Sequence, residues 1–100
     1  MDVKSSKKKN VLVYGAGEAG RQLVRSLKKN TEFKVAGFLD DNVKLYKKIL
    51  LNKKIYSSSD LKKLINSKDI SLVFLALPSI SRSKRNQIIK RLNKFKLIVK

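Results

Sequence analysis

A chain of 100 residues is long enough for one domain, and its lack of cysteine and histidine excludes disulfides, thiolate nucleophiles, cysteine–histidine zinc sites and histidine general bases from this segment. No apolar run approaches the ~20 residues that span a bilayer, and the lysine-rich start lacks the apolar core of a secretory signal. We therefore expect a cytoplasmic protein.

The charge is strongly unbalanced, with 25 Lys and Arg against 7 Asp and Glu, a formal net charge of +18. Such an excess is typical of a surface for nucleic acid or anionic lipid, or of a protein that places lysine on every exposed face. Lysine pairs recur along the whole chain, at Lys28-Lys29, Lys47-Lys48, Lys53-Lys54 and Lys62-Lys63. Because no arginine or aromatic stripe accompanies them, we predict a solvated surface and no nucleic-acid partner. An anionic membrane surface is the alternative.

In the first half of the chain, apolar runs typical of strands alternate with apolar residues at helical spacing. Residues 1–9 are lysine-rich without periodicity and are predicted to form a flexible basic arm. Residues 11–14 are an apolar run typical of a strand buried on both faces. From Glu18 or Ala19, apolar residues recur at helical spacing as far as Leu27. Residues 33–39 then predict a second strand, which ends at Asp40-Asp41-Asn42.

The second half continues the alternation. Residues 43–52 are ambiguous, and residues 55–56 predict a short edge strand. Serines 57–59 offer N-caps for a helix with apolar residues at 61, 64 and 65. Residues 70–77 form the most apolar run, which predicts a central parallel strand ended by Pro78. Ser79, Ser81 or Ser83 would cap a last helix, before a final strand over residues 96–99.

This order of elements predicts an α/β fold with a doubly wound parallel sheet of about five strands, in the order 3-2-1-4-5, and with helices on both faces. Residues 10–100 would form this single domain. Because the chain stops at its last predicted strand, we expect it to be a fragment of a longer protein.

Three glycines, Gly15, Gly17 and Gly20, follow the first predicted strand directly. A G-x-G-x-x-G sequence that follows a buried strand and opens an amphipathic helix is typical of a Rossmann-like dinucleotide-binding loop, and Asp40 stands where that fold places its ribose-binding acid. Gly15 would make the tight turn, Gly17 would let a pyrophosphate approach the backbone, and Gly20 would let the helix pack closely. Free amides at the positive helix end would then face the phosphates.

A carboxylate at Asp40 would accept hydrogen bonds from ribose hydroxyls and repel a 2′-phosphate, which favours NAD or a nucleoside-diphosphate ligand over NADP. The alternative is that the glycines only turn the chain and that the acids are a polar strand end. The ligand-binding residues predicted in this half of the chain are Gly15, Ala16, Gly17, Glu18, Ala19, Gly20, Asp40 and Asp41.

The other wall of the site is predicted after the central strand, because ligands of open parallel sheets bind between the carboxyl ends of strands 1 and 4. Leu77, Pro78 and Ser79 would form this wall. The hydroxyls of Ser79 and Ser81, with Arg82, would meet an anionic group of the ligand. Helix capping by these serines explains the same residues equally well.

Four segments together resemble a known family: VLVYGAGEAGRQLVRSL, VAGFLDDN, IYSSSDLKKLI and LALPSISRSKRNQII. They are similar to the N-terminal nucleotide-binding, CoA-binding-like domain of the polysaccharide-biosynthesis nucleoside-diphosphate-sugar epimerase/dehydratase family, the membrane-associated UDP-sugar 4,6-dehydratases. The resemblance covers roughly residues 10–99. It implies transmembrane helices before this domain, a short-chain dehydrogenase/reductase catalytic domain after it, and a basic arm at the inner face of the cell membrane. Residues 43–54 lack the proline and glycine usual for the family's loop.

The resemblance also implies chemistry that this segment does not carry. Such dehydratases use NAD and a Tyr-x-x-x-Lys pair, whereas the residues four positions after the three tyrosines here are Glu18, Leu50 and Asp60. We predict no catalytic residue and no metal site in this segment. The predicted function is a domain that binds NAD or a UDP-sugar, with CoA as an alternative ligand, within a sugar-nucleotide dehydratase or epimerase.

Two further hypotheses come from other classes. One is a stand-alone domain that senses NAD(H) or CoA, and the other is a scaffold domain that binds no nucleotide. Self-association into a homo-oligomer is compatible with each of them.

Overall fold

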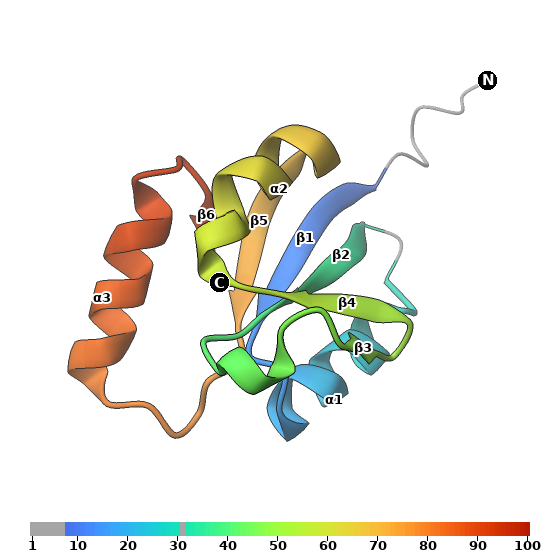
Figure 1. Cartoon of the computed structure of the whole chain (residues 1–100). Helices are drawn as coiled ribbons and strands as arrows, with labels where there is room; N and C mark the ends of the chain where they lie inside the picture. Colours follow the sequence, from blue (N-terminus) through green and yellow to red (C-terminus); the bar gives the residue numbers. More distant parts are fainter. Residues whose placement is uncertain (1–7, 31) are drawn as a thin grey trace.

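The computed structural model describes residues 8–30 and 32–100. The predicted arm over residues 1–9 lies outside this range except for its last two residues, and Lys9 already belongs to the first strand. Six strands form one sheet in the order β3-β4-β2-β1-β5-β6 (Figure 1). Their bounds are β1 Lys9–Tyr14, β2 Phe33–Leu39, β3 Ile49–Leu50, β4 Lys53–Tyr56, β5 Ile70–Leu75 and β6 Ile98–Val99.

The predicted strand order 3-2-1-4-5 is found as β4-β2-β1-β5-β6, in which all neighbours are parallel. The sixth strand, β3, comes from the ambiguous segment 43–52 and pairs antiparallel with β4. Leu51 and Asn52 connect the two strands with φ values of 52° and 65°, the left-handed geometry that two-residue hairpins require. The α/β class is thus confirmed, with one more strand than expected.

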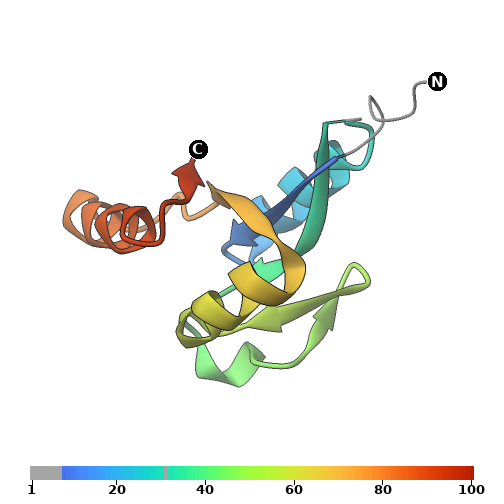
Figure 2. The same ribbon diagram turned by 90° about the horizontal axis from the view of Figure 1, so that it is seen from above.

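Three helices cover the two faces of the sheet (Figure 2). Helix α1 (Glu18–Leu27) packs on one face, and α2 (Leu61–Lys68) and α3 (Arg82–Asn93) pack on the other. Strand β1 lies at the centre, so that Val11 and Val13 join the core under α1 while Leu12 and Tyr14 join the opposite core. This two-sided burial explains why residues 11–14 of the strand are an unbroken apolar run.

The serines predicted as caps have different roles. Ser57 forms a capping box with Asp60 in the short 3₁₀ turn before α2, and the Ser81 hydroxyl accepts a hydrogen bond from the Lys84 amide at the start of α3. Each cap of this kind stabilises a helix by about 1 kcal/mol. Ser81, and not Ser79, is therefore the cap of α3. Ser79 lies beside the carboxyl ends of the strands.

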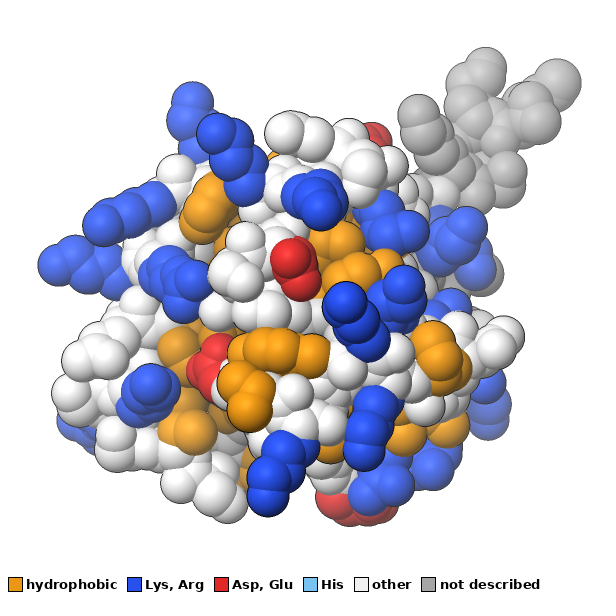
Figure 3. Space-filling view, viewed as in Figure 1, with side chains coloured by type: hydrophobic (Ala, Val, Ile, Leu, Met, Phe, Trp, Pro, Cys, Tyr) orange, Lys and Arg blue, Asp and Glu red, His pale blue; other side chains and the backbone are white. Residues whose placement is uncertain are grey.

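Lysine and arginine side chains are scattered over the whole face seen in Figure 3, with apolar side chains between them and few acids. This agrees with the even distribution of lysine pairs in the sequence. Across residues 8–30 and 32–100, no helix has both the length and the apolar character needed to cross a membrane.

Candidate functional site

Two of the three glycines are required by the backbone itself. Gly15 follows β1 with a φ of 121°, which side-chain-bearing residues rarely adopt. A Cβ at Gly15 would overlap the carbonyl oxygen of Ala76, and a Cβ at Gly20 would overlap that of Gly15. The turn and the close packing of α1 on the loop therefore account for both residues.

Gly17 is different. Its backbone at the start of α1 is extended, with φ −87° and ψ −159°, a conformation that any residue adopts. A Cβ at this position would meet no atom within 4 Å. Neither the turn nor the packing of the domain therefore requires a glycine here, and the space beside Gly17 is open.

That space belongs to a hollow of about 390 Å³ between the carboxyl ends of β1 and β5. The end of β5 is tied to β1 by a hydrogen bond from the Ala76 amide to the Tyr14 carbonyl, at 2.8 Å. The residues that line the hollow are Gly15, Gly17, Glu18, Ala19, Asp40, Ala76, Leu77, Pro78, Ser79 and Ile80. The glycine-loop hollow thus brings the two predicted walls together, and sequence reasoning missed only Ala76 and Ile80, which flank the predicted second wall.

Asp40 enters this hollow from the end of β2. Its Oδ2 accepts a hydrogen bond from the Ala16 amide at 2.8 Å, and its Oδ1 accepts one from the Asn42 amide at 2.9 Å. The carboxylate therefore fixes the shape of the glycine loop, a role that the sequence did not suggest. Since each carboxylate oxygen has two lone pairs, the same group retains capacity to accept a ligand hydroxyl.

Asp41 is not among the residues that line the glycine-loop hollow. Its Oδ1 accepts a hydrogen bond from the hydroxyl of Tyr14 at 2.8 Å. Burial raises the pKa of Tyr14 above its ordinary value, and the hydrogen bond to Asp41 raises it further. Asp41 thus supports the buried tyrosine at the end of β1, and its assignment to a ligand stays a prediction.

Glu18 brings a second carboxylate to the hollow, at the first turn of α1. It pairs with Arg21 at 3.0 Å and accepts a hydrogen bond from the Gln22 side-chain amide at 3.3 Å. The helix start attracts anions through its free amides and its dipole, whereas Glu18 and Asp40 oppose them. The hollow therefore combines free amides that suit an anion with two carboxylates that suit hydroxyl donors.

The opposite wall is mostly apolar. Leu77, Pro78 and Ser79 line it as predicted, and the Ser79 hydroxyl is its one side-chain polar group among the described residues. Ser81 caps α3 instead. Arg82 borders a different hollow, on the outer side of α3, so the predicted contribution of Ser81 and Arg82 to this wall finds no support in the geometry.

Comparison with known proteins places this site in context. The chain matches the family described as "C2185-like, N-terminal" over residues 7–98. The structure of UDP-D-quinovosamine 4-dehydrogenase from Vibrio fischeri is similar, with a TM-score of 0.89 and 41% identity over 93% of this chain and 76% of that one. No curated protein matches the chain.

Two structures of RSP, a Rex-family repressor, are also similar at 18% identity. RSP itself has a TM-score of 0.75, over 91% of this chain and 43% of that one. The complex with beta-NADH has a TM-score of 0.74, over 90% and 43%. This chain thus spans less than half the length of the repressor, and the likeness shows a shared Rossmann-like fold. The family match over nearly the whole sequence shows that the chain belongs to the C2185-like N-terminal domain family.

Proposed function

We propose that this domain binds a nucleotide in the glycine-loop hollow, with the ligand's diphosphate over Gly17 and the start of α1. The observation that carries the proposal is the open space beside Gly17. Neither the turn nor the packing of the protein requires a glycine at this position. A glycine at a helix start lets phosphate oxygens reach the backbone amides, and any side chain there would obstruct them. Gly15 and Gly20 alone would serve a domain that only needs the turn.

NAD(H) and a UDP-sugar are the ligands that we favour. Asp40 would accept hydrogen bonds from ribose hydroxyls, and Ser79 would face the diphosphate or sugar from the other wall. The Vibrio fischeri relative is named for a UDP-sugar, and one RSP structure is a complex with beta-NADH. CoA, which also carries a diphosphate, is the third ligand to test.

We further propose that the domain serves a sugar-nucleotide dehydratase or epimerase of cell-surface polysaccharide biosynthesis without carrying out the reaction itself. The hollow offers two carboxylates and one hydroxyl, and Asp40 is already engaged by two backbone amides. A short-chain dehydrogenase/reductase-type domain elsewhere in the protein would supply the tyrosine–lysine pair. The basic start of the chain would lie against the inner face of the cell membrane.

The test is calorimetric titration of the domain with NAD, NADH, NADP, UDP-N-acetylglucosamine and CoA, at moderate and at high salt. A Gly17→Val variant would be titrated in parallel, because its side chain should obstruct the phosphates and leave the core intact. Ser67→Val, on an exposed position of α2, is the matched control for adding a β-branched residue at the surface of a helix.

Saturable binding of one ligand that survives high salt and is lost only in Gly17→Val would support the proposal and identify the ligand. Weak binding of all five ligands that fades with salt and ignores Gly17→Val would contradict it. The glycines would then serve the turn alone, and the domain would be a scaffold.

A further inference from the structure

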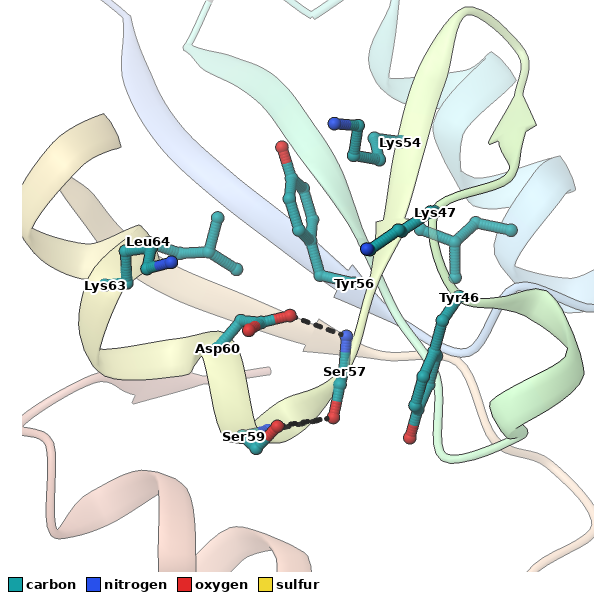
Figure 4. A pocket seen from close by; sticks show the side chains of 10 residues that line it. Tyr46, Lys47, Lys54, Tyr56, Ser57, Ser59, Asp60, Lys63 and Leu64 are labelled. Carbon is teal, nitrogen blue, oxygen red and sulfur yellow. Dashed lines mark hydrogen bonds between the residues drawn. The ribbon is translucent and has the colours of Figure 1, made fainter.

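A second hollow of about 380 Å³ lies between α2, β4 and the segment before β3 (Figure 4). It shares no lining residue with the glycine-loop hollow. Its lining residues are Tyr46, Lys47, Lys54, Ile55, Tyr56, Ser57, Ser59, Asp60, Lys63 and Leu64. We refer to it as the lysine–tyrosine hollow.

Three lysines from three separate segments border this hollow: Lys47 before β3, Lys54 in β4 and Lys63 in α2. Asp60 is the one acid among its lining residues, and its carboxylate is already engaged by the Ser57 amide at 3.3 Å in the capping box. Three ammonium groups against one carboxylate leave a net positive charge. Like charges gathered around one hollow favour a polyanionic ligand, which relieves their mutual repulsion.

The backbone at Lys47 is in the left-handed region, with a φ of 70°. It is held there by hydrogen bonds to β4, from the Lys47 amide to the Ile55 carbonyl at 2.8 Å and from the Ile55 amide to the Lys48 carbonyl at 2.9 Å. Most side-chain-bearing residues are strained in this conformation, which glycine or asparagine adopts more readily. These bonds fix the backbone of Lys47, and its side chain extends toward the hollow in Figure 4.

Tyr56 gives the hollow an aromatic wall. A Cβ at Gly37 would lie 2.8 Å from the ring's Cε2, so the absence of a side chain on β2 lets the ring lie close against the strand. The ammonium group of Lys54 is 5.9 Å from the ring centroid. Tyr46 lines the hollow from the segment before β3. An anchored ring beside ammonium groups is the combination that recognises a planar base attached to phosphate.

We propose that the lysine–tyrosine hollow is a second ligand site, which binds a nucleoside phosphate independently of the glycine loop. In this site the three lysines neutralise the phosphates of the ligand, and the base of the ligand packs against the ring of Tyr56. The carbonyl of Tyr56 accepts a hydrogen bond from the Asp40 amide at 3.0 Å, so one backbone bond joins the wall of the second site to the acid that shapes the glycine loop.

The test is a titration of the 15N-labelled protein with ADP and with inorganic pyrophosphate, followed by backbone amide chemical shifts. ADP is expected to shift the amides of Lys47, Tyr56 and Ser57 saturably. Changing Lys47, Lys54 and Lys63 together to Gln should weaken this binding at least about tenfold. The matched control changes three exposed lysines outside the hollow, Lys29, Lys62 and Lys94, to Gln, with an expected loss of less than about threefold.

Two further variants test whether the base of the ligand is recognised and whether the two sites bind independently. Tyr56→Leu should weaken ADP and leave pyrophosphate unchanged, and the amide spectrum shows whether this variant is folded. Gly17→Val should leave the shifts at Lys47 and Ser57 intact even if it abolishes shifts at residues 15–20. The proposal is overturned if both lysine triples lose the same affinity, if ADP shifts only the glycine loop, or if Gly17→Val removes the second set of shifts.

Discussion

The carboxylate of Asp40 accepts a hydrogen bond from the backbone amide of Ala16 at 2.8 Å, which ties the glycine loop to the end of the neighbouring strand. The other carboxylate oxygen holds the Asn42 amide at 2.9 Å. The residue that the sequence assigns to ribose therefore also determines the loop conformation. Its proposed role in binding and its structural role are coupled, and a single substitution should disturb both.

Asp40→Asn tests this coupling. An amide has one acceptor oxygen and cannot satisfy both backbone N–H groups, so one of them loses its partner. We expect the free energy of unfolding to fall by about 1–2 kcal/mol and the nucleotide affinity to fall at least about tenfold. Urea unfolding and calorimetric titration measure the two effects. Asp69→Asn, at an exposed helix C-cap, is the control, and equal effects in both variants would contradict the assignment.

Alanine substitutions at Gly20 and Gly17 should differ sharply in stability. A Cβ at Gly20 would overlap the Gly15 carbonyl oxygen, so Gly20→Ala should reduce the free energy of unfolding by about 3 kcal/mol. A Cβ at Gly17 meets only open space, so Gly17→Ala should change it by less than about 1 kcal/mol. Urea unfolding followed by circular dichroism measures the free energy of unfolding of both variants. Similar losses in both variants would show that Gly17 is also a packing residue.

The sequence predicts the sheet well because each central strand contains a run of apolar residues that is mostly buried in the structure. Strand β3 escapes prediction, since its hairpin depends on left-handed conformations at Leu51 and Asn52, and leucine carries no turn signal. The lysine–tyrosine hollow is equally hidden, because Lys47, Lys54 and Lys63 meet only in the folded chain.

The acids after β2 show a limit of motif reasoning. Both Asp40 and Asp41 are predicted from the sequence as ligand-binding residues, but Asp40 lines the glycine-loop hollow while Asp41 accepts a hydrogen bond from Tyr14. Both acids lie just beyond the end of β2, where the chain bends at Asp41, and the spacing of the motif does not show that their side chains have different partners.

Glu18→Gln should strengthen nucleotide binding. The Glu18 carboxylate borders the proposed diphosphate position, and its loss removes a repulsion at the positive end of α1. The side chain is 64% exposed, so solvent screens the effect, and we expect an increase of about threefold at low salt that shrinks at high salt. Calorimetry at two salt concentrations measures it, with Glu32→Gln at the far end of the sheet as control. A fall in affinity would instead indicate that Glu18 accepts a hydrogen bond from the ligand.

Tyr14→Phe should remove a pH dependence of stability. Burial, together with the hydrogen bond to Asp41, raises the pKa of Tyr14 above its ordinary value of 10.0. The unfolded chain therefore releases this proton first, so the tyrosine's contribution is fully present below about pH 10 and is lost as the pH rises further.

At pH 8 the variant should be less stable by about 1 kcal/mol, because it lacks the hydrogen bond. The difference between the two proteins should shrink from pH 9 to pH 11. All other ionisable groups are the same in both proteins, so urea unfolding at matched pH isolates Tyr14. A difference that stays constant up to pH 11 would mean that the hydroxyl ionises as easily in the folded protein as in the unfolded chain, and that Asp41 does not hold its proton.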